Sequence, residues 1–215
     1  MDIDSTKIFM HEIKNSLNNI FLLVELIETS KNGTNEYLPI IKREINNIRD
    51  INNDYNNLIN NANIPIRKEK IDISEIIIDV INELKYIDNS GIKIITDIPK
   101  SIAFLDKIKF KQVIYNIISN AYKYNVPKGI IFVQLLRMKT AFHIKVYDSG
   151  IGMSSTEIDK LGTPFYRCKK SAVHGTGLGW TIIKQLCEKM KWSVKLYSVN
   201  KDSYKTVVEL VIPDN

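Results

Sequence analysis

The chain begins with two long stretches in which apolar residues recur every three or four positions, the spacing of a helix that buries one face. The first stretch covers residues 9–27 and the second residues 38–59, although Asn52 stands where the second repeat requires an apolar residue. The short segment KNGTN separates them, and its Gly33 is a natural helix stop. Two helices joined by so short a loop form an antiparallel hairpin. One hairpin cannot bury both apolar faces, so we expect two copies to pair into a four-helix bundle.

The pattern changes near residue 62. The segment NNANIPIRKEK is polar with one proline, and we interpret it as a linker. We therefore expect a helical hairpin over residues 1–62 and a second domain over residues 63–215. Helical and strand-like segments segregate in this second part instead of alternating, which favours an α+β sandwich with a mixed sheet. The expected helices cover residues 72–84, 110–124, 154–157 and onward, and 179–190; the expected strands cover residues 92–98, 102–106, 130–138, 141–148, 192–199 and 206–213.

Size and composition limit the classes of protein that this chain can belong to. Its 215 residues suffice for one large domain or two small ones. The longest apolar run, residues 20–24, is far shorter than the ~18 residues that a membrane span needs. No basic-then-apolar leader opens the chain, and Cys168 and Cys187 lack a metal or redox spacing. We expect a cytoplasmic protein, or the cytoplasmic portion of a longer membrane-anchored chain.

Charge is distributed unevenly along the chain. Residues 1–62 hold 6 Lys and Arg against 9 Asp and Glu, a balance of −3, whereas residues 63–215 hold 24 against 15, a balance of +9. A basic domain can attract nucleic acid, a membrane surface or a phosphate-bearing small ligand. No Arg-rich helix and no interleaved aromatic residues accompany this charge. We therefore favour a small anion and expect no nucleic-acid partner.

The segment FKQVIYNIISNAYKY has polar residues on one face of an expected helix. At 100° per residue, Asn116, Asn120 and Lys123 fall within about 60° of one another, opposite an apolar arc. Amide oxygens suit a hard cation such as Mg²⁺, and a lysine supplies a point charge for phosphate. If the helix stood alone, a solvated polar face would explain the same residues.

Two glycine-rich segments follow this helix. In VYDSGIG, Asp148 ends an expected strand, and Gly150 and Gly152 permit a close approach of the backbone to a flat ligand. A buried carboxylate there can accept a hydrogen bond from an exocyclic amine such as that of adenine. In HGTGLG, alternate glycines open a helix whose N-terminal amides can hold phosphate. No Gly-Lys-Ser/Thr follows, so this segment is not a Walker loop.

Together these segments resemble the histidine protein kinases. NIISNAYKY is similar to their N box, DSGIG to the G1 box, Pro164-Phe165 to the F box, GTGLG to the G2 box, and MHEIKN to the H box. The resemblance extends over most of the chain, in the order and spacing of the family. It implies the catalytic core of a sensor histidine kinase, in which a dimerisation and histidine-phosphotransfer hairpin precedes an ATP-binding sandwich of the GHKL (Bergerat) type.

The resemblance also implies roles for three residues of the first helix. His11 would be the phosphoacceptor, and Glu12 would take the proton from its other ring nitrogen. Asn15 matches the position that in some members orients water to dephosphorylate the response regulator. Of the other histidines, His143 lies in mid-strand and reads as structural. His174 belongs to a basic loop that would form a lid over the nucleotide, residues 162–174.

For the nucleotide, the resemblance implies ATP and Mg²⁺ as cofactors. Asn120 would bind the metal, Asn116 and Lys123 would face phosphate, Tyr124 would lie near the nucleotide, and Asp148 would take the adenine amine. The full set of implied nucleotide-binding residues is Asn116, Asn120, Lys123, Tyr124, Asp148, Gly150, Gly152, Phe165, Gly175, Thr176, Gly177, Leu178 and Gly179.

The implied function is an ATP-dependent autokinase that passes phosphate from His11 to an aspartate of a response regulator, with a homodimer as the working form. One alternative is an ATP-binding phosphotransfer or scaffold protein without autokinase activity. Another is a chaperone-like ATPase, but those relatives usually carry a glutamate at the position of Asn116, and an amide cannot activate water. Ten residues precede His11, so sensor input would come from a missing N-terminal region or a separate protein. Ser16 stands where the family usually has proline.

Overall fold

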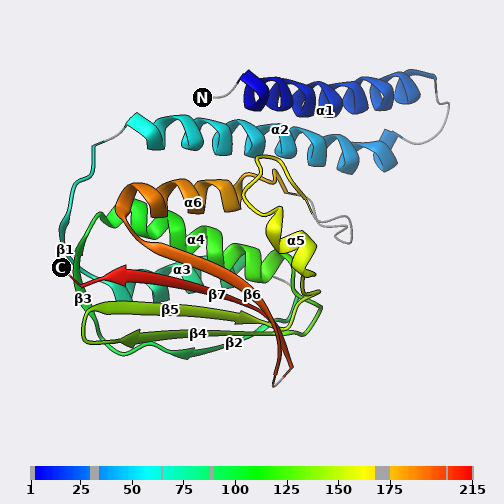
Figure 1. Ribbon diagram of the computed structural model, residues 1–215. Helices are drawn as coiled ribbons and strands as arrows, with labels where there is room; N and C mark the ends of the chain where they lie inside the picture. The colour runs from blue at the N-terminus through cyan, green and yellow to red at the C-terminus, as the bar shows by residue number, and fades with distance from the viewer. Residues whose placement is uncertain are drawn as a thin grey trace.

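A computed structural model describes residues 3–29, 34–63, 65–87, 90–167, 175–201 and 203–214. Three layers follow one another in it: a helical hairpin, a layer of helices, and a sheet (Figure 1). The hairpin consists of α1 (Ile3–Thr29) and α2 (Thr34–Asn63), which run antiparallel. The predicted fold class, a helical hairpin followed by a mixed-sheet domain, is confirmed.

Helices α1 and α2 are joined by both aromatic and polar contacts. Phe9 stacks on Tyr55 with ring centroids 3.8 Å apart, and the Thr6 hydroxyl lies 3.1 Å from the Tyr55 hydroxyl. Further along, Asn47 Nδ2 donates to Ser16 Oγ at 3.0 Å, and Ser16 is buried. Helix α1 continues through Ser16, which therefore serves as a polar contact to α2 at the position where the histidine kinases usually have proline.

The apolar repeat of residues 38–59 is interrupted at Asn52, but the packing of α2 has no gap there. Ile51 is almost fully buried, whereas Asn52 is exposed, so the apolar face of α2 shifts by one residue at this point. Other apolar side chains of the hairpin remain exposed in the single chain, among them Leu17, Phe21 and Ile45. The hairpin therefore buries one face internally and leaves a second apolar face uncovered.

The second domain is built on a five-stranded sheet with the strand order β2-β4-β5-β7-β6. The first pair is parallel and the other neighbours are antiparallel, which makes the sheet mixed, as predicted. A separate antiparallel pair joins β1 to β3. The strands are β1 (Glu69–Asp72), β2 (Lys93–Asp97), β3 (Ile102–Leu105), β4 (Ile130–Arg137), β5 (Ala141–Asp148), β6 (Ser193–Lys201) and β7 (Tyr204–Pro213).

The segment expected to be a linker contains structure at both ends. Helix α2 continues to Asn63, and β1 begins at Glu69 and pairs with β3 more than thirty positions later. The pairing is non-local, so the polar composition of NNANIPIRKEK gave no sign of it. At the last residue of β1, Asp72 Oδ1 accepts hydrogen bonds from the amides of Ser74 and Glu75. This caps the next helix near the predicted position.

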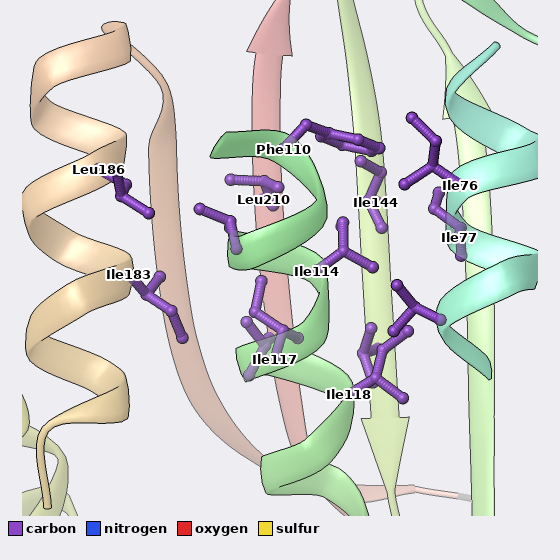
Figure 2. Close-up of a cluster of buried hydrophobic side chains, with 14 of the residues drawn as sticks. Ile76, Ile77, Phe110, Ile114, Ile117, Ile118, Ile144, Ile183, Leu186 and Leu210 are labelled. Carbon is purple, nitrogen blue, oxygen red and sulfur yellow. The ribbon is translucent and has the colours of Figure 1, made fainter. Parts of the chain in front are cut away.

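Helices α3 (Ile73–Ile87), α4 (Lys107–Lys123) and α6 (Gly179–Met190) cover one face of the sheet, and a short helix, α5 (Ser155–Asp159), precedes the lid segment. Figure 2 shows isoleucine and leucine side chains of these three helices meeting those of β5 and β7. Ile117 and Ile144 are almost fully buried there. On the outer side of this layer, α2 lies along α6 (Figure 1). Among the described residues, no helix has both the length and the apolar composition for crossing a membrane.

Candidate active site

A cavity of about 780 Å³ lies where the hairpin meets the second domain. Its walls come from α2, α4, the end of β5 and the segment that leads into α6. Polar residues from all of these elements line it. This position at the ends of several elements is typical of a ligand site.

The polar face of α4 forms one wall. Asn116 donates through Nδ2 to the carbonyl of Gln112 at 2.9 Å, so the side-chain oxygen stays available. A Cβ atom at Gly179 would lie 3.4 Å from Asn116 Oδ1 and 3.9 Å from Asn120 Oδ1. Both amides therefore lie beside the start of α6, and Lys123 lines the same cavity. Two amide oxygens and a lysine at a helix start form a donor set that fits phosphate with Mg²⁺.

Asp148 supplies a buried carboxylate at the other end of the site. Only 7% of the residue is exposed, and its Oδ1 accepts a hydrogen bond from the Gly150 amide at 2.9 Å. Burial raises the pKa of Asp148 to about 6, against the hydrogen bonds from Gly150 and from Thr206, which lower it. Such a carboxylate can accept a hydrogen bond from a ligand amine. Thr206 was not predicted, because only the pairing of β5 with β7 places it opposite Asp148.

Two glycines are required by close approaches of the backbone. A Cβ atom at Gly150 would lie 2.2 Å from the Tyr124 carbonyl oxygen, which leaves no room for a side chain. At Gly177, with φ +72°, a Cβ atom would lie 2.6 Å from the Phe165 carbonyl carbon. Phe165 itself has φ 64°, so it is held in a left-handed conformation against the glycine-rich segment.

The structure brings most of the predicted nucleotide-binding residues to this cavity. Gly150, Phe165 and Leu178 do not line it; they support its walls, and Leu178 is fully buried beneath the start of α6. The lid segment is described as far as Arg167, and its residues 168–174, which include Lys169, Lys170 and His174, lie outside the described residues. The predicted residues that line the cavity are Asn116, Asn120, Lys123, Tyr124, Asp148, Gly152, Gly175, Thr176, Gly177 and Gly179.

His11 lies on the exposed side of α1, with 70% of its side chain accessible. Its Nδ1 is 3.1 Å from Asn15 Nδ2 and 4.0 Å from Glu12 Oε1. The three predicted residues are thus neighbours, and both contacts involve Nδ1, which leaves Nε2 toward solvent. His11 does not line the cavity, because α2 lies between α1 and the second domain (Figure 1).

His143 lies on β5, and its Nδ1 is 3.1 Å from Glu209 Oε1. Lys145 Nζ lies 3.4 Å from the same oxygen. The His143 ring therefore belongs to a polar cluster with Glu209 and Lys145 on the sheet, away from the cavity.

Helix α2 contributes residues to the cavity that the sequence did not suggest. The Thr176 hydroxyl donates to Asp54 Oδ2 at 2.6 Å, and the Leu178 amide donates to the Thr176 hydroxyl at 3.1 Å. Arg43 and Asp50, from the same face of α2, also line the cavity. No sequence signal marks these residues, since their place in the site depends on how the hairpin lies against the second domain.

Comparisons with known proteins agree with this geometry. Residues 105–215 match the family model described as "Histidine kinase-, DNA gyrase B-, and HSP90-like ATPase". The sensor protein kinase WalK of Staphylococcus aureus is 31% identical over 83% of this chain and 46% of its own length. The two-component system protein A of Emericella nidulans is 28% identical over 92% of this chain and 31% of its own. The chain thus spans less than half the length of these relatives.

Two solved structures show the same fold over nearly the whole chain. The histidine kinase AdeS of Acinetobacter baumannii superposes with a TM-score of 0.77 and 18% identity, covering 95% of this chain and 98% of that one. The histidine kinase ThkA, solved in complex with the response regulator protein TrrA, also gives a TM-score of 0.77, with 18% identity, over 99% of this chain and 62% of that one.

The family match covers the part of the chain that carries α4, Asp148 and the glycine-rich start of α6, which are the walls of the cavity. The hairpin that precedes it has the same place in the kinase structures, since the superposition covers both parts. The chain therefore belongs to the family of histidine kinase-, DNA gyrase B- and HSP90-like ATPases, and its hairpin followed by an ATP-binding domain is the make-up of a sensor histidine kinase catalytic core.

Proposed function

We propose that this chain is an ATP-dependent histidine autokinase that phosphorylates His11 and passes the phosphoryl group to an aspartate of a response regulator. The observation that carries the proposal is the pairing of two sites in one chain. A cavity with a buried carboxylate and two amides beside a glycine-rich helix start suits ATP. An exposed histidine with a solvent-facing Nε2 suits a phosphoacceptor.

In this proposal the cavity binds ATP in one orientation. Asp148 accepts a hydrogen bond from the adenine amine, and Tyr124 lies along the nucleotide. Asn116, Lys123 and the amides of the glycine-rich segment face the phosphates. The Asn120 side-chain oxygen would help to hold Mg²⁺, which would neutralise charge on the triphosphate. An amide at position 116 cannot take a proton from water, which favours transfer over hydrolysis.

The transfer step uses both nitrogens of His11. Nε2 attacks the γ-phosphorus, a P–N bond forms, the bond to the bridging oxygen breaks, and ADP leaves with that oxygen. The step uses the tautomer with its proton on Nδ1, so the Asn15 amide nitrogen, which donates toward Nδ1 in this structure, turns away, and the proton passes to the Glu12 carboxylate, 4.0 Å from Nδ1. In a second reaction, the dephosphorylation of the response regulator, Asn15 orients the attacking water toward the phosphorylated aspartate. Its place 3.1 Å from the ring supports this role.

A response regulator is the proposed partner because ThkA, which has the same fold, was solved with the regulator TrrA. We also propose that residues 1–62 act as the dimerisation and phosphotransfer domain and residues 63–215 as the ATP-binding domain. The exposed apolar residues of the hairpin support a homodimer. Light scattering should show a dimer for the whole chain and a monomer for a fragment that starts at about Pro65. A monodisperse monomer of the whole chain at high concentration would contradict the dimer.

The proposal is tested by incubating the protein with γ-labelled ATP and Mg²⁺. We expect a protein-bound phosphate that is labile in acid and stable in alkali, the behaviour of a phosphohistidine. A purified receiver domain added afterwards should take the label. ATP binding without any label would favour the phosphotransfer or scaffold alternative. Rapid release of free phosphate without labelled protein would favour a chaperone-like ATPase.

A further inference from the structure

Helix α2 places acidic side chains at the phosphate end of the cavity. Asp54 Oδ2 accepts a hydrogen bond from the Thr176 hydroxyl at 2.6 Å, the usual length for a hydroxyl that donates to a carboxylate. The Thr176 hydroxyl in turn accepts from the Leu178 amide at the start of α6. Asp50, one turn earlier on α2, lines the same cavity. The hairpin is therefore joined to the glycine-rich segment through one carboxylate.

The groups around Asp54 are those that a nucleotide phosphate would use. Lys123 attracts the Asp54 carboxylate, Asp50 repels it, and the Thr176 hydroxyl joins it to the start of α6. Lysine, hydroxyl and a helix N-terminus are also the donors that bind phosphate. Burial raises the pKa of Asp54, a cost that the Thr176 hydrogen bond and Lys123 offset in part. The Asp54 carboxylate thus lies at the place where a phosphate of the nucleotide is expected to bind.

We propose that Asp54 is a built-in competitor for the phosphates of ATP: in the docked hairpin it occupies the Thr176 hydroxyl and lies in the field of Lys123, so phosphate binding requires α2 to release that hydroxyl. The inference rests on the proposed nucleotide site and adds to it the regulation of that site. Asp50 strengthens the competition, since a second carboxylate on the same wall repels a triphosphate.

Two consequences follow from the competition. ATP should loosen the contact between α2 and the start of α6, because binding and docking lower each other by the same factor. That release would also free the hairpin to bring a His11 ring toward the cavity, from which α2 separates it in the docked chain. Adenosine has no phosphates, so it should bind without displacing Asp54.

The test compares ATP and adenosine binding by calorimetry on the whole chain with Mg²⁺ present. In Asp54→Asn, the amide oxygen still accepts from Thr176, but the negative charge is gone. We expect ATP to bind about tenfold tighter than to wild type, or about 1.4 kcal/mol, with adenosine binding unchanged. The matched control is Glu36→Gln, which removes an exposed carboxylate from the first turn of the same helix outside the cavity. It should bind both ligands as wild type does.

Unchanged or weaker ATP binding by Asp54→Asn would overturn the inference, and weaker binding would instead make Asp54 a part of the nucleotide site. Equal gains for ATP and adenosine would overturn it too, because a general loosening of the hairpin is not competition at the phosphates. These results leave the proposed function standing so long as wild type binds ATP. A wild-type chain that binds neither ligand would remove the nucleotide site itself.

Discussion

The hairpin and the ATP-binding domain differ in how far they bury and fix the residues proposed to act in them. The side chain of His11 is 70% accessible; its ring lies 3.1 Å from the Asn15 amide nitrogen and 4.0 Å from the Glu12 carboxylate. Asp148 is 7% exposed, is fixed by Gly150, and lies at the edge of a continuous core. A nucleotide site gains from groups that are positioned before the ligand arrives, because no ordering is left to be done on binding. A phosphoacceptor, the role proposed for His11, would have to meet both a nucleotide and a regulator, so it would have to be accessible.

The same contrast appears in the packing. The core of the ATP-binding domain joins helices α3, α4 and α6 to the sheet without a break (Figure 2). The hairpin adds Tyr55 and Leu58 to that core, but much of α1 remains exposed. The fixed domain and the accessible hairpin should therefore respond differently to mutation.

The largest expected effect is on stability. Ile117 is 1% exposed in the core of the ATP-binding domain, whereas Leu17 is 53% exposed on α1. Ile117→Ala should lower the free energy of unfolding by about 2–5 kcal/mol through lost burial and a cavity. Leu17→Ala should change it by less than about 0.5 kcal/mol in a dilute, monomeric sample. Urea denaturation measures both. Equal losses in that sample would show that the contrast in packing is wrong.

The second effect concerns nucleotide affinity. Asp148→Asn should weaken ATP binding by about 10- to 100-fold, because the amide presents a donor toward the adenine amine and the charge-assisted hydrogen bond is lost. Asp159→Asn, which changes an exposed carboxylate on α5, is the control. Equal ATP affinities of the two variants by calorimetry would show that Asp148 is not part of the nucleotide site. The contrast between a buried nucleotide-site residue and an exposed histidine would then fail.

A third prediction concerns Asn15, which lies beside the exposed His11 on the hairpin. Asn15→Ala should leave labelling of His11 nearly intact and slow dephosphorylation of a phosphorylated regulator about tenfold, equal to about 1.4 kcal/mol of barrier. The control is Asn19→Ala, which changes another exposed amide one turn further along α1. Decay of purified phosphorylated regulator is followed with kinase and ADP present. If both variants matched wild type, Asn15 would have no phosphatase role.

The smallest effect is a dependence on pH. The pKa of Asp148 is raised to about 6, so the carboxylate is ionised above that pH and gains a proton as the pH falls through it. Adenosine should therefore bind about twofold more weakly at pH 6 than at pH 8, since half of the carboxylates are then protonated. Adenosine is used because it has no phosphates, so it should not meet Asp54, whose pKa is also raised by burial. Flat affinity from pH 8 to pH 5 would mean that the amine is not held by this carboxylate.

Sequence patterns predicted the two halves of the fold well for a physical reason. Helix periodicity and capping are local, so α1, α2 and the capped helix α5 could be expected from neighbouring residues. Strand β1 could not, because four polar-flanked residues become a strand only by pairing with β3. The apparent interruption of the apolar repeat at Asn52 was a smaller error, because the neighbouring Ile51 is buried in its place.

The site residues also divide into those that local sequence patterns predict and those that only the fold brings together. Asn116, Asn120 and Lys123 share a helix face, so their grouping follows from spacing alone. Asp148 and the glycine-rich segment lie near them in the cavity only through the fold, and the family resemblance supplied that step. Asp54 came from neither source. Its contact with Thr176 depends on how the hairpin lies on α6, which neither periodicity nor the nucleotide motifs encode.

The central claim is that the accessible histidine of the hairpin, and no other, receives phosphate from the nucleotide held by the second domain. The most direct test labels wild type, His11→Gln and His143→Gln with γ-labelled ATP and measures ATP binding on the same samples. We expect all three to bind ATP alike, the wild type and His143→Gln to carry label, and His11→Gln to carry none. Label that persists on His11→Gln would contradict the claim.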